Sequence, residues 1–439
     1  MKRRLAYTAL LTALGVNLFF GARVYLHSEE VSRQNDVYDQ LHLFAQVLAR
    51  VSEDYVDRDK VSYEALIRGA LRGMLNSLDP HSEFLEPRKY EDLRSDTEGK
   101  FGGIGIQLGT RQGVLTVIAP IEGTPAYEAG VLSGDQIIRI GDKSTEGFTP
   151  ADAVDLLRGD PGTEVTFTTL RPATGATRDV TVTRADIKVD SVKDTNGSTR
   201  FPLGDDGIGY IRINQFGEQT SDELDRALAA LGEAGMKGLI LDLRDNPGGL
   251  LDQAAKVCGR FLPPKTLVVS TEGPDPKERR EFLVPRGGKH INTPMVLLVN
   301  GGSASASEIV AGCLQDLKRA VLVGEQTFGK GSVQSIIPLE DGAALRLTTA
   351  KYYTPSHRVI HEQGITPDIV VPVPTEDIGA LAMKRVPGAV ETLRKDQREQ
   401  IEAVTDVQLD RAHDLLKGIL LYSERHDRDT GGVKTASVG

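Results

Sequence analysis

A run of small residues provides the first side chain in this sequence that could carry out chemistry. Residues 300–308 read NGGSASASE, and Ser305 stands where an apolar helix should follow an apolar strand. Backbone N–H groups at the N-terminus of a helix favour negative charge. A serine there can act as a nucleophile with an oxyanion-binding site beside it. However, Ser305 and Glu308 also match a capping box, and Ser303 could be a plain N-cap, so a structural role is the alternative.

Lys330 is the second candidate, within the run GEQTFGKG at 324–331. This run nearly spells a nucleotide-binding P-loop. However, Gly331 stands where a P-loop has the hydroxyl that binds Mg²⁺, and residues 332–339 have the pattern of a strand rather than a helix. The sequence therefore argues against nucleotide binding. It leaves either a lysine held in a glycine-flanked bend or an ordinary surface lysine in a turn.

A pair of glycines is the third candidate element. Gly248 and Gly249 end the run DNPGG, which follows the apolar strand expected at 238–243. Glycines at a strand-to-helix turn let backbone amides approach a ligand closely. A turn that merely needs positive φ angles explains the pair equally well.

The sequence shows no pattern typical of a metal or cofactor site. None of its eight histidines lies in the glycine-rich runs, and the HExxH and CxxC motifs are absent. His357 and His361 could still approach Ser305 in space and act as an alternative base. Two cysteines are too few for a disulfide scaffold, so we expect Cys258 and Cys313 to be buried thiols, although one disulfide between them is arithmetically possible.

The strand and helix patterns around these residues predict the elements that position them. Strands alternate with helices from residue 190 to 372, which indicates an α/β core. The expected strands are 208–213, 238–243, 295–299 and 320–323, the expected helices are 221–231, 249–262 and 305–317, and a hairpin is expected from 332–339 and 344–352.

The remaining regions differ in composition. Residues 96–188 predict a compact module of short strands and two helices, whereas residues 30–95 and 373–423 have apolar residues at helical spacing. The polar segment 424–439 is expected to be a disordered tail.

The charge balance and the N-terminus limit the possible partners and compartment. The 439 residues carry a net charge of −10, so the chain lacks the positive charge of a nucleic-acid-binding protein. Three basic residues precede an uncharged run at 5–22, at the short end of a membrane span. Residues 1–26 therefore predict a signal anchor, with a cleaved signal peptide as the alternative, and a body outside the cytoplasm.

Taken together, these motifs resemble those of a known family. The runs GSASASEI at 302–309 and VGEQTFGKGSVQ at 323–334 look like the signature of the carboxyl-terminal processing proteases. These tail-specific proteases are PDZ-containing serine peptidases of bacterial envelopes and chloroplasts. The run DLRDNPGGLL at 242–251 matches the other core motif of the family, and LDPHS at 78–82 and GGIG at 102–105 match its N-terminal and PDZ motifs.

The resemblance covers about residues 36–375 and implies the fold. It implies an α+β multidomain protein with a ClpP/crotonase-like α/β protease core at 190–372. A PDZ domain at 96–188 would be inserted, with helical regions on either side.

The resemblance also assigns roles to individual residues. Ser305 resembles the nucleophile, Lys330 the general base and Gln334 the residue that orients the lysine. The resemblance implies that the oxyanion-hole donors are Ala306 and Gly249, with its neighbour Gly248 as the alternative to Gly249. Gln326 stands where relatives commonly have lysine, at a position that is not catalytic.

Catalysis by a lysine base requires a neutral amine close to the residue that orients it. The amine must be neutral, and lowering a lysine pKa from about 10.4 to about 7 costs about 4.6 kcal/mol. Burial is the usual means, and Phe328 could shield the amine of Lys330 from water. Lys330 and Gln334 would be about 13 Å apart on an ideal strand, so a bend at Gly329 or Gly331 must bring them together.

The PDZ resemblance implies how substrates are chosen. Gly103, Ile104, Gly105 and Ile106 fall where PDZ domains bind a terminal carboxylate, and such domains add a peptide as an extra strand. The implied partners are envelope proteins recognised at their C-termini, an adaptor protein and a second copy of the chain bound through the helical regions. A crotonase-like acyl hydrolase and a membrane-tethered PDZ scaffold without catalysis are the competing hypotheses.

Overall fold

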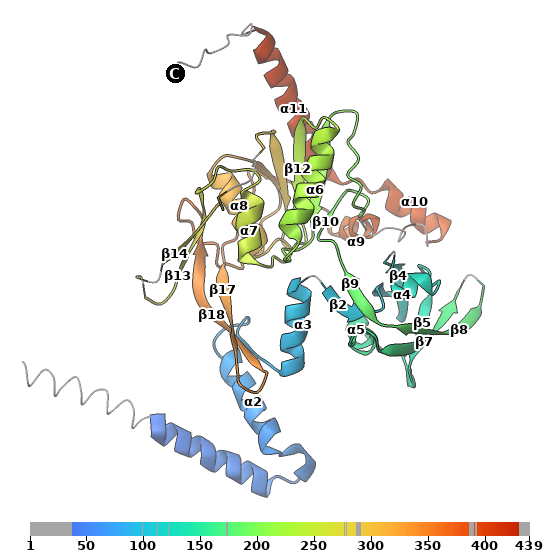
Figure 1. Ribbon diagram of the computed structural model, residues 1–439, viewed down its shortest axis with the longest axis vertical. Helices are drawn as coiled ribbons and strands as arrows, with labels where there is room; N and C mark the ends of the chain where they lie inside the picture. The colour runs from blue at the N-terminus through green and yellow to red at the C-terminus, as the bar shows by residue number, and fades with distance from the viewer. Residues whose placement is uncertain are drawn as a thin grey trace, which may run out of the picture. The chain divides into compact units, whose positions relative to one another are not determined.

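The computed structural model divides the described chain into two units, with the boundary between Phe84 and Leu85 (Figure 1). The described residues are 37–98, 100–111, 113–121, 123–172, 174–275, 277, 279–286, 291–385, 390 and 393–429. The predicted signal segment at 1–26 lies outside them. Among the helices that the structure does describe, none combines the length and the apolar character needed to cross a membrane.

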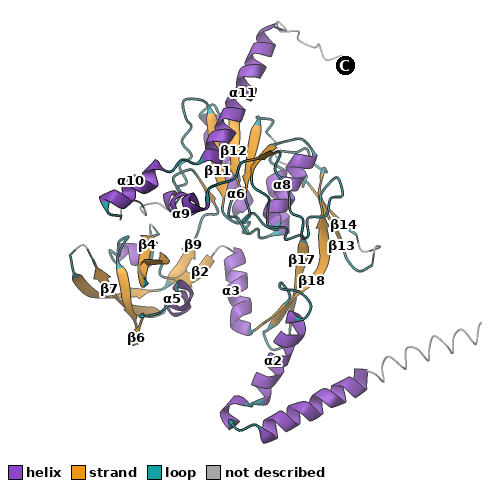
Figure 2. Cartoon of the chain, turned by 180° about the vertical axis from the view of Figure 1, so that it is seen from behind, coloured by secondary structure: helices purple, strands orange, loops and turns teal. Residues whose placement is uncertain are grey.

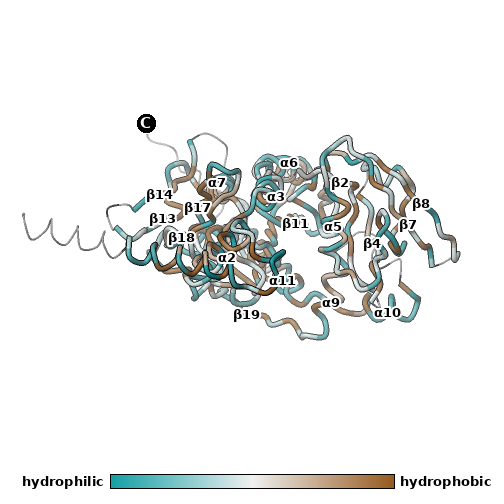
Figure 3. Tube along the Cα trace, turned by 90° about the horizontal axis from the view of Figure 1, so that it is seen from below, coloured by the Kyte–Doolittle hydropathy of each residue, from teal (hydrophilic) through white to brown (hydrophobic). Residues whose placement is uncertain are grey.

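The first unit is helical in its described part. A helix over 37–54 is followed by the 3₁₀ helix η1 (Arg58–Lys60) and by α2 (Tyr63–Asn76). α2 begins where Ser62 Oγ accepts the N–H of Ala65 at 3.2 Å. α2 contains both apolar and charged residues, so its trace carries both hydrophobic and hydrophilic colours (Figure 3). The strand β1 (Glu83–Leu85) crosses the boundary between the units, and the helix α3 (Pro87–Glu98) belongs to the second unit. The expectation of a purely helical region at 30–95 is therefore wrong at β1.

The PDZ-like module is built from short antiparallel strands around its own apolar core. Its main sheet has the order β3-β4-β5-β7-β8, with β6 paired to β5, and β2 pairs with β9 in a second small sheet. The strands are β2 (Lys100–Gly103), β3 (Ile106–Arg111), β4 (Val114–Pro120), β5 (Gln136–Ile140), β6 (Lys143–Ser144), β7 (Glu164–Arg171), β8 (Ala176–Thr183) and β9 (Ala185–Lys188). The two predicted helices are α4 (Pro125–Glu128) and α5 (Pro150–Leu157).

A second region has the predicted alternation of strands and helices. Its sheet has the order β10-β11-β12-β15-β16-β19, and all pairs except β10–β11 are parallel. These strands are β10 (Val192–Lys193), β11 (Ile208–Ile213), β12 (Gly238–Asp242), β15 (Met295–Val299), β16 (Val321–Gly324) and β19 (Ile369–Val370), and the helices between them are α6 (Thr220–Glu233), α7 (Leu251–Cys258) and α8 (Ala306–Asp316).

A second sheet in this region contains the predicted hairpin. β17 (Ser332–Pro338) pairs with β18 (Ala344–Tyr353), which continues to β13 (Leu267–Glu272) and β14 (Arg280–Leu283). β13 and β14 were not among the strands expected from the sequence pattern.

Helices cover both faces of the parallel sheet (Figures 1 and 2). Strand residues point alternately to opposite faces. Leu239 and Leu241 pack with α6, α7 and α8, whereas Ile240 packs with Ala412 and Leu416 of α11 (Val407–Asp429). The other two C-terminal helices are α9 (Thr375–Lys384) and α10 (Lys395–Ala403). The C-terminal region is therefore part of the core packing.

Two smaller expectations can be compared with this structure. Cys258 and Cys313 are buried, unpaired thiols, as predicted, and do not form a disulfide. The expected disordered tail at 424–439 is wrong for residues 424–429, because α11 continues to Asp429. Residues 430–439 lie outside the described part.

Candidate active site

Ser305 occupies a strained turn between β15 and α8. It is the N-cap residue of α8, with φ +55° and ψ −114°. A residue with a side chain costs about 1–3 kcal/mol in such a conformation. Ser305 is partly exposed between the buried Ala304 and Ala306, and its side chain makes no cap hydrogen bond. A partly exposed serine in this strained turn fits a nucleophile, and Glu308 forms its half of the capping box by accepting the N–H of Ser305.

Ser303 has a structural role, but not as an N-cap. It is fully buried, and its Oγ donates to the carbonyl of Leu243 at 2.8 Å and accepts the N–H of Asn300 at 3.0 Å. These bonds tie the end of β12 to the turn before α8. The alternative reading of Ser303 as a helix cap is therefore wrong.

The glycine pair lies directly against the serine. A Cβ atom on Gly248 would come within 2.6 Å of the Ala304 carbonyl oxygen, 2.7 Å of Ser305 Cβ and 2.9 Å of Ala306 N. Gly248 also has φ +100°, so a side chain would be strained there even without these neighbours. Close approach of the two backbones thus explains why this position requires glycine.

The hydrogen bonds of the glycine pair distinguish its two amides. The N–H of Gly248 donates to Asn246 Oδ1 at 2.9 Å, so it is already used. The carbonyl of Gly248 accepts the N–H of Phe216 at 2.9 Å. In a trans peptide the C=O and the next N–H point in opposite directions. The N–H of Gly249 is therefore directed away from Phe216, which favours Gly249 over Gly248 as an oxyanion donor.

Ala306 provides a second backbone N–H group that can serve as an oxyanion donor. It is the first residue of α8, and the first N–H groups of a helix have no acceptor within the helix. This amide adjoins Ser305 in the sequence and lies beside Gly248 in space. The two oxyanion donors implied by the resemblance thus come from neighbouring segments.

Glu308 connects the serine and lysine segments. Its carboxylate is fully buried and accepts the N–H of Ser305 at 2.9 Å and the N–H of Lys330 at 2.8 Å, both on Oε2. Oε1 accepts Thr327 Oγ1 at 2.5 Å and the N–H of Gly329 at 2.7 Å. Burial raises the pKa of Glu308, and these four donors act in the opposite direction. In the sequence alone, Glu308 is recognisable only as half of a capping box.

Lys330 lies in a tight turn with a partly buried side chain. The N–H of Gly331 donates to the carbonyl of Gly329 at 3.1 Å, across Lys330, and Gly329 has φ +91°. Burial lowers the pKa of Lys330, the charge of Arg346 lowers it further, and Glu308 opposes both. Among the ion pairs of the described residues, none joins a carboxylate to the Nζ of Lys330. A bend is therefore present at Gly329, but no contact between Lys330 and Gln334 is among the hydrogen bonds of the described residues, and the lowered pKa makes the amine easier to deprotonate than that of an exposed lysine.

Phe328 does not shield this amine in the way that we expected. It is 62% exposed, so the burial of Lys330 comes from other residues. Gln326 contacts the loop at 363–366 through its side-chain amide, donating to the carbonyl of Gln363 and accepting from Thr366 Oγ1.

Gln334 lies on β17, where the pairing with β18 shifts register between Val333 and Gln334. Its Nε2 donates to Ser332 Oγ at 3.1 Å and to Thr348 Oγ1 at 2.9 Å. These hydrogen bonds do not include Lys330, so the orienting role implied by the resemblance stays a prediction.

The two histidines considered as alternative bases have other neighbours. His357 Nε2 lies 2.9 Å from Glu272 Oε1, and its ring stacks on Tyr353. His361 Nε2 is 3.9 Å from Glu362 Oε1. None of these contacts involves Ser305, so the structure offers no support for a Ser-His pair.

The predicted carboxylate loop of the PDZ-like module has suitable geometry. The carbonyl of Ile104 accepts the N–H of Ala126, and that of Gly105 accepts the N–H of Ile121, each at 2.9 Å. The N–H groups of Gly105 and Ile106 belong to the same peptide units and therefore point the other way. Gly103 ends β2, and β3 is an edge strand of the sheet with α5 beside it. An edge strand can accept an additional strand.

Comparisons with known proteins find two family matches and several similar proteins. The model of peptidase family S41 matches residues 207–371, and a PDZ domain model matches residues 116–171. A carboxy-terminal-processing protease of Bartonella bacilliformis is 40% identical over 92% of this chain and 95% of the relative. The carboxy-terminal processing protease CtpA of Bacillus subtilis is 34% identical over 85% of this chain and 78% of the relative. A solved photosystem II D1 C-terminal processing protease is 30% identical, covering 79% of this chain and 97% of its own, with a TM-score of 0.44.

The candidate catalytic residues all lie inside the matched peptidase region. Ser305, Lys330 and Gln334 fall between residues 207 and 371, as do the glycine pair and Ala306. The carboxylate loop at 103–106 lies just before the part matched as a PDZ domain. Since the similarity to the Bartonella bacilliformis relative extends over nearly the full length of both proteins, this chain belongs to the carboxyl-terminal processing proteases of peptidase family S41.

Proposed function

We propose that this protein is a serine endopeptidase in which Ser305 is the nucleophile and Lys330 is the general base. The observation that carries the proposal is the partly buried amine of Lys330, whose pKa is lowered by burial and by Arg346. Glu308 supports it, because one oxygen of its carboxylate binds the backbone of both residues.

The reaction follows from this arrangement. The neutral Nζ of Lys330 accepts the proton of Ser305 Oγ while that oxygen attacks the carbonyl carbon of the scissile peptide bond. The N–H groups of Ala306 and Gly249 stabilise the negative charge on the carbonyl oxygen. The ammonium group of Lys330 then protonates the leaving amine. Water, activated in turn by Lys330, hydrolyses the acyl-enzyme.

Substrate choice is assigned to the PDZ-like module. A protein C-terminus would pair with the edge strand β3 and place its carboxylate at the N–H groups of Gly105 and Ile106. Because this mode of binding requires a terminal carboxylate, it selects substrates by their C-termini rather than by an internal sequence.

The compartment and the assembly state are further parts of the proposal. The basic residues before position 5 and the uncharged run at 5–22 support an inner-membrane anchor with a periplasmic body acting on envelope proteins. A ClpP/crotonase-like core, a dimer formed through the helical regions and an adaptor partner stay predictions from the family resemblance. Fractionation of cells that express a tagged chain tests the anchor, because full-length protein in the cytosol would contradict it.

Cleavage of an unfolded protein is the direct test of the activity. The wild-type chain should cut such a substrate, and Ser305→Ala should not. An acyl hydrolase would instead turn over small thioesters or esters and leave the protein intact. A scaffold without catalysis would bind C-termini but cleave neither substrate.

A further inference from the structure

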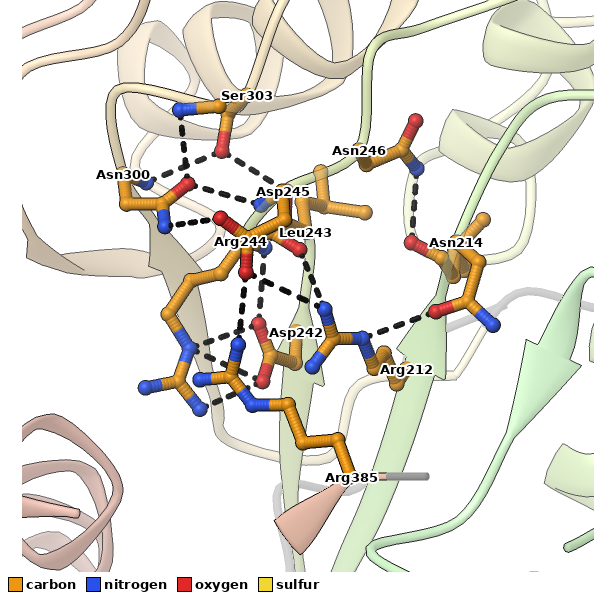
Figure 4. Close-up of polar contacts among 12 residues, drawn as sticks. Arg212, Asn214, Asp242, Leu243, Arg244, Asp245, Asn246, Asn300, Ser303 and Arg385 are labelled. Atoms are coloured by element: carbon orange, nitrogen blue, oxygen red, sulfur yellow. Dashed lines mark hydrogen bonds and ion pairs between the residues drawn. The ribbon is translucent and has the colours of Figure 1, made fainter. Parts of the chain in front are cut away.

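The loop that carries the glycine pair is held at its first residue by the C-terminal region. Asp245 has φ +59° and exchanges two 2.8 Å hydrogen bonds with Asn300, in the turn before Ser305 (Figure 4). Its Oδ2 accepts Arg385 Nη1 at 2.7 Å and lies 3.5 Å from Arg212 Nη2. Arg385 directly follows α9, so a helix far along the chain contacts the loop.

The residue before this loop is anchored to the same region. Arg244 is 1% exposed, and its guanidinium binds the buried carboxylate of Asp242 at 2.7 Å. It also binds both oxygens of Asp406, at 2.8 and 2.9 Å, and Gln408 Oε1 at 3.1 Å. Burial disfavours the charge on Asp242, but Arg244 and Arg212 outweigh this and hold its pKa well below the usual range. Both groups are therefore charged at neutral pH.

Asp406 links this cluster to the start of α11. Its Oδ1 accepts the N–H of Leu409 at 3.1 Å, in the first turn of the helix. Ala412 and Leu416 of α11 are fully buried against the parallel sheet. Arg385 also lies 3.7 Å from Asp406. The two contacts with the loop segment, through Arg385 and through Asp406, thus belong to one connected support.

The cluster of Arg244, Arg385 and Asp406 contacts the loop that carries the glycine pair, but not the carboxylate of Glu308. Ser305 and Lys330 are joined by Glu308, which has no contact with the arginine cluster among the hydrogen bonds that the structure gives it. Inside the loop, Asn246 and Gly248 are bonded to Ile213, Ala304, Ser307 and Phe216. Asp245, at its start, is held by Asn300 on one side and by Arg385 on the other. Loss of the C-terminal contact would release the Asp245 end of the loop that leads to Gly249, whereas the hydrogen bonds of Glu308 to Ser305 and Lys330 would remain.

We propose that Arg385 and Asp406 are positioning residues that hold the oxyanion loop in place, so that the C-terminal helices control the rate of the chemical step. This inference rests on the proposed Ser-Lys function. It assigns the C-terminal region a role in catalysis, acting through Asp245 and Arg244 rather than by contact with substrate. Misplacement of a catalytic group by about 1 Å can cost on the order of 100-fold in rate.

The test is a comparison of Arg385 variants in the full-length protein. Arg385→Met should lower kcat roughly 10- to 100-fold and leave KM within about twofold, because only the oxyanion donor is displaced. Arg385→Lys keeps a cation near Asp245 and should restore most of the activity. The matched control is Arg394→Met, since the side chain of Arg394 is 74% exposed and pairs only with Asp396 among the ion pairs of the described residues.

A transition-state analogue separates positioning from general destabilisation. A peptide aldehyde forms a hemiacetal with Ser305 and requires the oxyanion hole, so its affinity for Arg385→Met should fall in parallel with kcat. All rates are measured well below each variant's melting temperature, and Arg385→Gln provides a second substitution if Arg385→Met does not fold. Unchanged kcat and aldehyde affinity in the folded variants would overturn the inference. Cleavage by Ser305→Ala would instead overturn the proposed function itself.

Discussion

Ser305 and Lys330 donate their backbone N–H groups to the same oxygen atom, Oε2 of the buried Glu308, at 2.9 and 2.8 Å. The two residues are 25 positions apart in the sequence, yet one carboxylate fixes both segments. The buried carboxylate of Glu308 therefore holds the backbone of both the candidate nucleophile and the candidate base.

Lys330→Arg should abolish cleavage and leave the fold intact. Arginine keeps the positive charge but cannot release a proton at a usable pH. Single-turnover cleavage of an unfolded substrate measures the effect, with melting temperatures recorded alongside. The double variant with Ser305→Ala should be no less active than either single variant, because the two residues act as one unit. Substantial activity in Lys330→Arg would exclude lysine as the base.

The activity should rise with pH through a lysine pKa below the usual 10.5. Burial is the main cause and the charge of Arg346 is the second, so Arg346→Gln should move this rise to higher pH. A pH profile of kcat/KM for both proteins gives the comparison. An unchanged profile in the folded Arg346→Gln variant would mean that another group titrates.

The same shift predicts how stability depends on pH. Between the lowered pKa in the folded state and 10.5 in the unfolded state, the unfolded chain binds more protons, so the free energy of unfolding rises with pH. Lys330→Met should remove this contribution. Denaturant titrations at a series of pH values provide the measurement, and parallel curves for the two proteins would contradict the assigned shift.

Glu308→Gln should reduce both activity and stability. The carboxylate accepts four donors, whereas an amide directs its NH₂ group toward two of them, which costs about 2–4 kcal/mol. Urea unfolding and kcat are the readouts. Glu399→Gln is the control, because the side chain of Glu399 is 66% exposed. Wild-type behaviour of Glu308→Gln would show that the shared carboxylate is dispensable.

Gly248→Ala should lower activity by at least about 100-fold, since its Cβ would lie within 2.9 Å of Ala306 N and displace the oxyanion site. Gly232→Ala in α6 is the matched control. A Cβ there meets nothing within 4 Å, and alanine favours a helix. Equal kcat values for the two variants would argue against the assigned oxyanion loop.

The inactive Ser305→Ala protein should bind peptides through their free C-termini. Amidation removes the charge that the N–H groups of Gly105 and Ile106 would hold, and we expect the affinity to fall at least about tenfold. Isothermal titration of the acid and amide forms of one peptide measures this. Equal affinities would mean that the module recognises something other than a terminal carboxylate.

The sequence by itself determined the residues that could do chemistry and the elements that carry them. These residues occur in local patterns: a serine after an apolar strand, a lysine between glycines and a glycine pair at a turn. Such patterns can be recognised in a sequence because they depend on the backbone preferences of neighbouring residues. The alternation of strands and helices also predicted the α/β region and the closing hairpin, because hydrophobic periodicity depends mainly on neighbouring residues.

Only the tertiary structure decided how these residues are used. The choice of Gly249 over Gly248 as the oxyanion donor depends on which carbonyl accepts the N–H of Phe216. The role of Glu308 in joining the serine and lysine segments depends on a turn that begins at Thr327, nineteen residues later. The contact of Arg244 with Asp406 joins residues 162 positions apart. Hydrogen-bond direction and contacts of this range are set by sheet register and by which face a helix covers, because those fix where each backbone and side-chain group points in space.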